Sequence, residues 1–196
     1  MIRPWAGKAL LSLCLPFGLA ACAQDLGREW KAADADTSKI VFEAPGLEDQ
    51  KARFLRSYNE RQSVLVESAS WVGPKARHAK AAVFYVRASP GYYLVYRGDD
   101  PQEKLRYFED FKDKSVSFGP LEAEVNGLGR IKHRSFGFEG VNCVVFLQFL
   151  GGGDAGGDRG SAASGEQEII GYYCADPGQP LQKPVIHQVV TSIGLR

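Results

Sequence analysis

The chain has 196 residues, of which 44% are hydrophobic and 11% aromatic, and its net charge at pH 7 is +1. This length suits one domain plus a processing segment, and the apolar content is sufficient for a hydrophobic core. A charge so close to neutral gives the protein no general electrostatic attraction for nucleic acid, so a nucleic-acid partner is not expected.

The N-terminal segment has the pattern of a signal peptide. Residues 1–8 carry Arg3 and Lys8 without any acidic residue, and residues 9–21 form an apolar stretch. This stretch is too short to span a membrane as a helix, and Pro16 and Gly18 interrupt it. We therefore expect residues 1–21 to be removed during export.

The end of this segment, Leu19-Ala20-Ala21-Cys22, resembles the lipobox of bacterial lipoproteins. The resemblance implies cleavage before Cys22, a diacylglyceryl thioether on Cys22 and acylation of the new N-terminus. Such an anchor would hold the protein stably on a membrane. Ala23 follows, rather than the Asp that often marks retention in the inner membrane, which favours the outer membrane facing the periplasm.

An ordinary signal peptide is the alternative for the same residues. Ala21-Cys22-Ala23 is also a small-residue cleavage site, and cleavage before Gln24 would give a soluble periplasmic or secreted protein. Both interpretations place the mature protein outside the cytoplasm.

Two of the four cysteines are expected to form a disulfide. Cys14 is lost with the signal peptide and Cys22 carries lipid, which leaves Cys143 and Cys174 in an oxidising compartment. Two free buried cysteines are the alternative. A metal site is not expected, because neither cysteine has a flanking histidine or carboxylate at ligand spacing.

The segments around these cysteines predict an antiparallel hairpin. Residues 141–150 and 169–173 are apolar and rich in strand-forming side chains. A register with Cys143 opposite Cys174 also places Val145 opposite Tyr172, Leu147 opposite Ile170 and Leu150 opposite Gln167. The glycine-rich segment 151–165 would then be an exposed, flexible loop.

Residues 22–38 are predicted to be a lipidated tether, and residues 39–196 a single domain. Strands are expected at 39–44, 63–72, 80–88, 92–97, 115–118, 121–125 and 128–138. Helices are expected at three places: 47–60, from the spacing of its apolar residues; 100–113, with Asp100 as N-cap and Pro101 in the first turn; and from Pro184 onward, with an apolar stripe.

These elements predict an α+β fold, an antiparallel sheet with about three helices, stapled by one disulfide. The hairpin strands are apolar on both faces, which indicates a central position covered on both sides. The order of elements and the amphipathic C-terminal helix resemble PsbP-type sandwiches.

No catalytic motif or cofactor-binding motif is found. His78, His133 and His187 stand alone in sequence, without the spacing of metal ligands or of a known catalytic group. No catalytic residue, cofactor or metal ligand is therefore predicted.

Basic residues suggest one candidate binding surface. Lys75, Arg77 and Lys80 form a cluster, and Arg130, Lys132 and Arg134 alternate along one strand face. If these two segments are adjacent in the fold, their basic side chains would make a binding patch for an anionic partner, such as a phosphorylated glycan or a lipid head group. The alternative is a solvent-exposed face whose basic residues have acidic neighbours. We favour this alternative, because clusters of charged residues usually lie on ordinary protein surface.

Two functions remain open. The first is a non-catalytic envelope lipoprotein that binds a protein, glycan or lipid partner. The second is an envelope hydrolase whose site is dispersed in sequence. An exposed apolar patch away from the tether would favour the first, and a cleft with a histidine close to a carboxylate or serine would favour the second.

Overall fold

The computed structural model describes most of the chain after residue 28. The described residues are 29–47, 50, 52–60, 63–72, 79–92, 94–96, 98–151 and 163–196. The predicted signal peptide, Cys22 and residues 152–162 of the glycine-rich segment lie outside this part of the chain.

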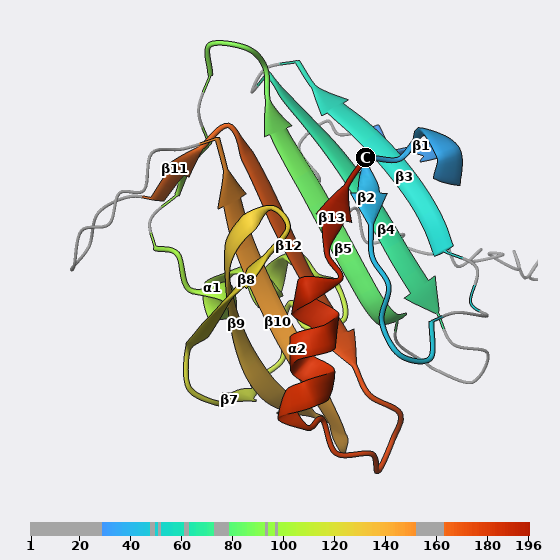
Figure 1. Cartoon of the computed structure of the whole chain (residues 1–196). Coiled ribbons are helices and arrows are strands. Elements are labelled where there is room, and N and C mark those ends of the chain that lie inside the picture. Colours follow the sequence, from blue (N-terminus) through green and yellow to red (C-terminus); the bar gives the residue numbers. More distant parts are fainter. Residues whose placement is uncertain are drawn as a thin grey trace, which may run out of the picture.

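One antiparallel sheet of nine strands dominates the structure (Figure 1). Its strands are β1 Lys31–Ala33, β3 Ala52–Asn59, β4 Val64–Val72, β5 Ala79–Ala88, β7 Ser117–Phe118, β8 Glu122–Asn126, β9 Gly129–Phe138, β10 Val141–Leu150 and β12 Gln167–Cys174. Their order is β1-β3-β4-β5-β12-β10-β9-β7, and β8 pairs with a second stretch of β9. All of these pairings are antiparallel, which confirms the predicted antiparallel sheet.

The smaller elements lie around this sheet. Two further pairs of short strands are β2 Ile40–Val41 with β13 Gly194–Leu195, and β6 Leu94–Tyr96 with β11 Ala163–Gly165. The helices are α1 Pro101–Lys104 and α2 Lys183–Thr191, and the 3-10 turns are η1 Ala35–Thr37 and η2 Leu105–Tyr107. The described part therefore has two α-helices rather than about three, and the sheet is the larger component.

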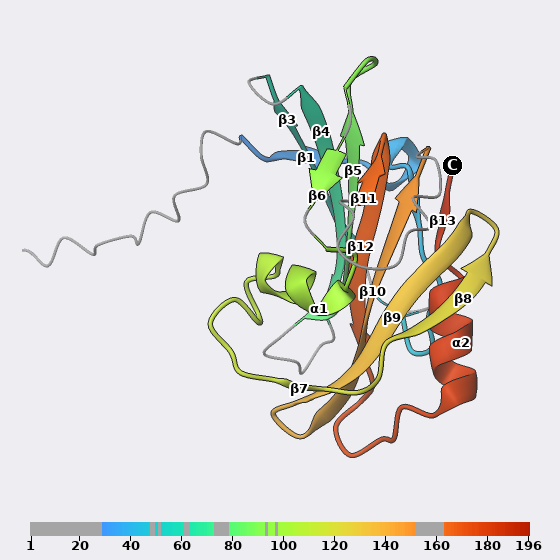
Figure 2. The ribbon, with the colours of Figure 1, turned by 90° about the vertical axis from the view of Figure 1, so that its left-hand side faces the viewer.

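Strands β10 and β12 occupy the middle of the sheet, with both faces buried. Val144 and Phe146 of β10 belong to the core cluster that includes the apolar face of α2. Val145 and Leu147 belong to the opposite cluster, which Phe108 and Phe111 cover from the segment after α1. Figure 2 shows α1 and α2 on opposite sides of the sheet. The prediction of a central hairpin covered on both sides is confirmed.

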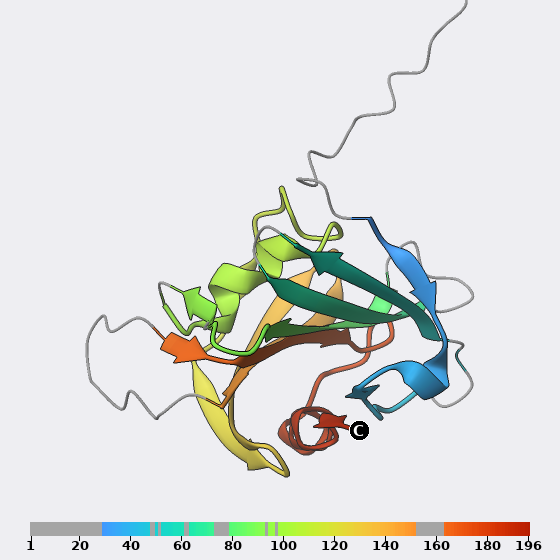
Figure 3. The ribbon, with the colours of Figure 1, turned by 90° about the horizontal axis from the view of Figure 1, so that it is seen from above.

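Helix α2 lies in the concave side of the curved sheet, as the view from above shows (Figure 3). Ile186, Val189 and Val190 are buried on the sheet, and Ile193 continues the stripe beyond the helix end. The amphipathic C-terminal helix is thus confirmed. The helix contacts β8 at one edge of the sheet. The space between α2 and β8 forms the cleft described below.

The predicted hairpin register is confirmed. Cys143 pairs with Cys174, Val145 with Tyr172, Leu147 with Ile170 and Leu150 with Gln167. Between these positions, Phe146 lies opposite Gly171, and a Cβ atom on residue 171 would come 2.3 Å from Cζ of Phe146. Glycine at this position gives the phenyl ring the space it occupies on the sheet.

The helix predicted at 47–60 is wrong. Residues 52–59 form β3, which pairs with β1 on one side and β4 on the other. Neighbouring strands satisfy its backbone, and Arg56 contributes a 2.9 Å ion pair to the buried carboxylate of Glu67 on β4. Tertiary pairing therefore overrides the helical spacing of its apolar side chains.

The helix predicted at 100–113 is shorter than expected. Asp100 is the N-cap and accepts a hydrogen bond from the backbone N–H of Gln102, as predicted, but α1 ends at Lys104 and a 3-10 turn follows. Leu105, Phe108 and Phe111, in and after this turn, are buried.

The folded domain begins before residue 39. Lys31–Ala33 form the edge strand β1, so the last part of the predicted tether 22–38 belongs to the sheet. The segment that follows β1 is fixed to the sheet by the buried side chain of Glu67, which accepts a 2.8 Å hydrogen bond from the backbone N–H of Lys39.

Candidate functional site

The candidate site is an open cleft between β8, β9 and α2, which we call the β8–α2 cleft. Its volume is about 410 Å³, and its lining residues are Glu122, Ala123, Glu124, His133, Lys183 and Ile186. None of these side chains carries a hydroxyl or a thiol. The cleft therefore combines two carboxylates, an imidazole and an ammonium group with the apolar side chain of Ile186.

The alternation of strand residues positions the acidic side chains. Glu122 and Glu124 are half-buried, whereas Ala123 and Val125 between them are exposed. Successive side chains of a strand point to opposite faces, so both glutamates lie on the face that carries α2. Glu122 is directly opposite His133 of β9 in the register, which brings that histidine to the same face.

Glu124 lies between two histidines from different elements. Its Oε1 is 3.4 Å from Nε2 of His133, and its Oε2 contacts Nδ1 of His187 on α2. His187 is exposed, whereas only 1% of His133 is accessible to solvent. One carboxylate thus connects the β8–β9 hairpin to the helix.

A pair of amide side chains fixes the other end of the hairpin. Asn126 donates a 3.0 Å hydrogen bond to Oε1 of Gln148, whose Nε2 donates one of 2.9 Å to Oδ1 of Asn126. Asn126 also donates to the carbonyl oxygen of Val190, near the end of α2. This part-buried amide pair, with both of its hydrogen bonds formed, holds β8 close to the helix.

The burial of His133 favours the neutral form of its imidazole. Burial lowers its pKa, although the carboxylates of Glu124 and Glu122 act in the opposite direction. At the cleft rim, the Lys183 ammonium lies 3.7 Å from Oε1 of Glu122 in an exposed ion pair. Two carboxylates and one ammonium leave the cleft with a net negative charge.

Nε2 of His133 is buried and makes no well-formed hydrogen bond among the described residues. Oε1 of Glu124 lies 3.4 Å from it, an ion-pair contact that is at most a weak hydrogen bond. Buried polar atoms in native proteins nearly always have a partner, so an unpaired one that faces a cleft is unusual.

No family model, curated protein or solved structure matches this chain at a significant level. In the described part of the chain, no helix is both long enough and apolar enough to cross a membrane. Within the same residues, no group of three or more histidine, cysteine or acidic side chains is arranged to hold a metal ion.

The three predicted histidines have different outcomes. His78 lies outside the described residues. His187 lies on the exposed side of α2. His133, which the sequence placed in a strand between basic residues, is buried on the opposite face from them and contacts Glu124.

The predicted anionic-ligand patch is not brought together by its described members. Lys75 and Arg77 lie outside the described residues. Lys80 on β5 pairs at 3.0 Å with Asp176. Strands β12 and β10 separate β5 from β9, a distance of roughly 14 Å at the usual strand spacing.

The basic residues of β9 do share one face, and two of them have acidic partners. Lys132 contacts Asp99. Arg134 makes a bidentate pair with Asp100, at 2.9 Å from Nε to Oδ1 and 2.7 Å from Nη2 to Oδ2. Arg130 is exposed and has no acidic partner within the described residues. The alternative of a solvated face with acidic neighbours therefore fits Lys132 and Arg134.

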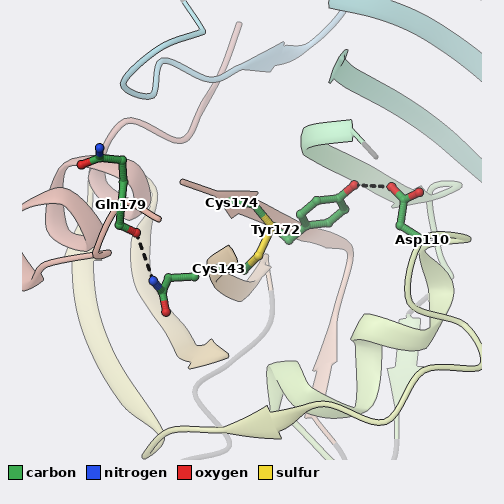
Figure 4. The surroundings of a disulfide bond; sticks show 6 residues. Asp110, Cys143, Tyr172, Cys174 and Gln179 are labelled. Atoms are coloured by element: carbon green, nitrogen blue, oxygen red, sulfur yellow. Dashed lines mark hydrogen bonds between the residues drawn. A yellow bond between two sulfur atoms is a disulfide. The ribbon is translucent and has the colours of Figure 1, made fainter. Parts of the chain in front are cut away.

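The disulfide Cys143–Cys174 is present and joins directly opposite residues of β10 and β12 (Figure 4). Next to it, the hydroxyl of Tyr172 donates a 2.7 Å hydrogen bond to Oδ2 of Asp110. On its other side, Asn142 donates to the carbonyl oxygen of Gln179, in the segment that leads to α2. The bridge itself is buried in the core cluster that also contains Phe108, Phe111 and Tyr172.

Glu122 and Glu124 were not predicted as site residues from the sequence. Two adjacent strands were predicted at 121–125 and 128–138 without a register between them. The register of the hairpin, with Asn126 opposite Gly129, places Glu122 opposite His133. The short turn between the two predicted strands was the signal that could have revealed this pairing.

Proposed function

We propose that this protein is an exported, lipid-anchored binding module of the cell envelope that docks a protein partner on the open edge of β8. The N-terminal pattern ending in Leu19-Ala20-Ala21-Cys22 supports export and anchoring through Cys22. The observation that carries the binding role is an uncharged apolar stripe on an edge strand.

The stripe consists of Leu121, which directly precedes β8, and of Ala123 and Val125, which alternate along β8 with the cleft residues Glu122 and Glu124. Ala123 also borders the cleft. Leu121 is 42% exposed and Val125 is 72% exposed, and Ala123 between them is also exposed. Edge strands of natural proteins usually carry charges on such positions to prevent pairing with another chain. Here the charges of the strand, Glu122 and Glu124, point instead into the cleft.

The edge itself has free backbone groups. Among the described strands, β8 pairs only with β9, so its other side offers unpaired N–H and C=O groups. An extended segment of another protein can add to such an edge as a further strand, with backbone hydrogen bonds for affinity and alternate side chains for specificity.

The position of this edge suits an anchored protein. β1, where the described chain enters the sheet, lies at the opposite edge from β8. Seven strand spacings separate the two edges, which corresponds to roughly 34 Å along the sheet. An anchor at the N-terminus would thus leave the β8 edge free to meet a partner.

The chemistry of the edge indicates which segment fits. Leu121 and Val125 offer apolar contacts, and Arg130 lies directly opposite Val125 in the register without an acidic partner among the described residues. The favoured partner is therefore an extended segment with apolar residues facing the stripe and an acidic side chain next to Arg130.

Two substitutions test the docking edge. Val125→Lys adds a charge to the stripe without loss of a buried contact, and Val72→Lys is its matched control, because Val72 is a strand valine that is 56% exposed elsewhere on the sheet. Affinity purification from detergent-solubilised envelopes should recover a partner with the wild type and with Val72→Lys, but not with Val125→Lys. Equal recovery with all three proteins would contradict the proposal.

The anchor is tested by Cys22→Ser. This substitution should move the protein from the membrane fraction to the soluble fraction. Continued membrane association, or a mature wild-type N-terminus at Gln24 by intact mass, would refute lipidation.

A hydrolase is the second candidate, and one observation favours it. His133 is a neutral imidazole with Nε2 at 3.4 Å from a carboxylate oxygen of Glu124, which is an arrangement that can take a proton from water. Since the cleft lining has no hydroxyl or thiol, the nucleophile would have to be water. Turnover of ester, glycoside or phosphoester substrates that disappears in His133→Gln would establish this candidate, and turnover that survives the substitution would exclude His133 as the base.

A further inference from the structure

The β8–α2 cleft has the features of a binding site for a cation. Glu122 and Glu124 supply two carboxylates, and one exposed ammonium, that of Lys183, only partly balances them. The second feature is the buried Nε2 of His133, which lines the cleft and makes no well-formed hydrogen bond among the described residues.

We propose that the β8–α2 cleft binds a primary ammonium group at the end of an aliphatic chain. An ammonium group has three N–H donors and no acceptor. With the ring proton of neutral His133 on Nδ1, the cleft offers three acceptors on two strands: the carboxylates of Glu122 and Glu124 on β8, and Nε2 of His133 on β9. The bound ammonium would thus satisfy the unpaired nitrogen and neutralise the excess negative charge together.

The apolar contact in the cleft suits the chain that carries the ammonium. Ile186 of α2 lines the cleft beside the polar groups. Lysine and other alkylamines bury their methylene groups along apolar surface while the charged end stays with polar partners. A lysine side chain of a peptide and a free alkylamine share this chemistry.

Lys183 provides evidence within the chain that an ammonium approaches the cleft. Its Nζ is 3.7 Å from Oε1 of Glu122, and 88% of its side chain is exposed. The pair is therefore weak and easily exchanged. It makes Lys183 a competitor for an incoming ammonium, so its removal should tighten binding.

The test is titration of the purified full-length protein with N-acetyl-lysine methylamide, followed by NMR of the His133 imidazole and by calorimetry. The uncharged probe N-acetyl-norleucine methylamide has the same apolar stem without the ammonium. We expect saturable shifts of His133 with the lysine probe and none with the norleucine probe. Butylamine identifies the source: weaker binding than the lysine probe indicates a peptide side chain, and equal binding indicates a free amine.

Matched variants locate the site. Glu122→Gln and Glu124→Gln should each weaken binding at least about tenfold, because each removes one charge-assisted hydrogen bond. Lys183→Met should tighten it severalfold. Glu109→Gln is the control, because Glu109 is an exposed acid outside the cleft, and it should change nothing.

The results that would overturn the proposal are definite. Absence of saturable His133 shifts with the lysine probe, or equal shifts with the norleucine probe, would exclude an ammonium site. Binding of Zn²⁺ at His133 and His187 without any binding of the amines would make the cleft a metal site instead. Val125→Lys changes the face of β8 that points away from the cleft, so it should leave amine binding unchanged. Loss of partner docking in this variant and loss of amine binding in the glutamate variants can therefore be distinguished from each other.

Discussion

Removal of the disulfide should destabilise the protein without changing its fold. Cys143 and Cys174 are separated by 31 residues, and closing a loop of this size stabilises a folded chain by about 3.7 kcal/mol in the chain-entropy model. For a domain of this size, such a loss lowers Tm by roughly 7–15 °C. The variant carrying both Cys143→Ala and Cys174→Ala should show a loss of this size.

The fold should persist because buried side chains, as well as the disulfide, fix the register between β10 and β12. Val145 and Leu147 face Tyr172 and Ile170 in one buried cluster, and a slip by one residue would move all of them to the other face. Secondary structure of the variant, measured by circular dichroism at low temperature, should therefore match that of the wild type.

Urea unfolding with and without reductant measures the effect of the bridge directly. Cys143 is fully buried, so alanine at this position also removes some packing, whereas reduction of the wild type does not. Reductant should lower the wild-type midpoint and leave that of the double variant unchanged. A wild-type midpoint that reductant does not move would refute the reasoning.

Three other predictions concern buried polar groups. Lys104 and Glu168 form a 2.8 Å ion pair with both side chains 3% exposed, so Lys104→Met or Glu168→Leu alone should cost about 3–5 kcal/mol, and the double variant much less. In urea unfolding, a double variant that loses the sum of both single effects would exclude this coupling. Tyr172→Phe removes the hydrogen bond to Asp110 and should cost about 1–2 kcal/mol, whereas Tyr107→Phe at an exposed site should be neutral by the same measurement. Burial lowers the pKa of His133 against the effect of Glu124 and Glu122, so its contribution to stability is complete above about pH 6.5 and is lost as the pH falls through the folded-state pKa. The urea midpoint of His133→Gln should therefore change less between about pH 7 and pH 5 than that of the wild type, and an equal or larger change would contradict this assignment.

The parts of the fold that the sequence predicted are those in which several signals agree. In the central hairpin, apolar side chains, two cysteines and a glycine-rich connection all indicated one register, and the structure has that register. Helix α2 was equally predictable, because Ile186, Val189 and Val190 form a stripe that only a helix places on one face.

Both errors in the predicted helices arose because the spacing of a few apolar residues was the main signal for a helix. Phe54, Leu55 and Tyr58 fit a helical face, but Tyr58 is 53% exposed in a strand that other strands flank on both sides. After α1, Leu105, Phe108 and Phe111 recur every third residue, which is the period of a 3-10 turn. Their backbone follows the same period, since Phe108 N–H donates to Leu105 and Phe111 N–H donates to Phe108.

The candidate site was harder to predict because it depends on long-range pairing. Glu124 and His187 are 63 residues apart in sequence, and only the packing of α2 against the β8–β9 hairpin joins them. No spacing rule for local motifs detects such a contact. The basic patch failed for the opposite reason, since similar residues were grouped across strands that the sheet order separates.

The most direct test of the account is photo-crosslinking in living cells from the exposed edge of β8. A photoreactive amino acid at position 125, with position 72 as the matched control, reports what contacts each site. We expect one discrete adduct with another envelope protein from position 125 and none from position 72. No adduct from position 125, the same adducts from both positions, or an adduct only with a second copy of this chain would contradict the proposal of a protein-docking edge.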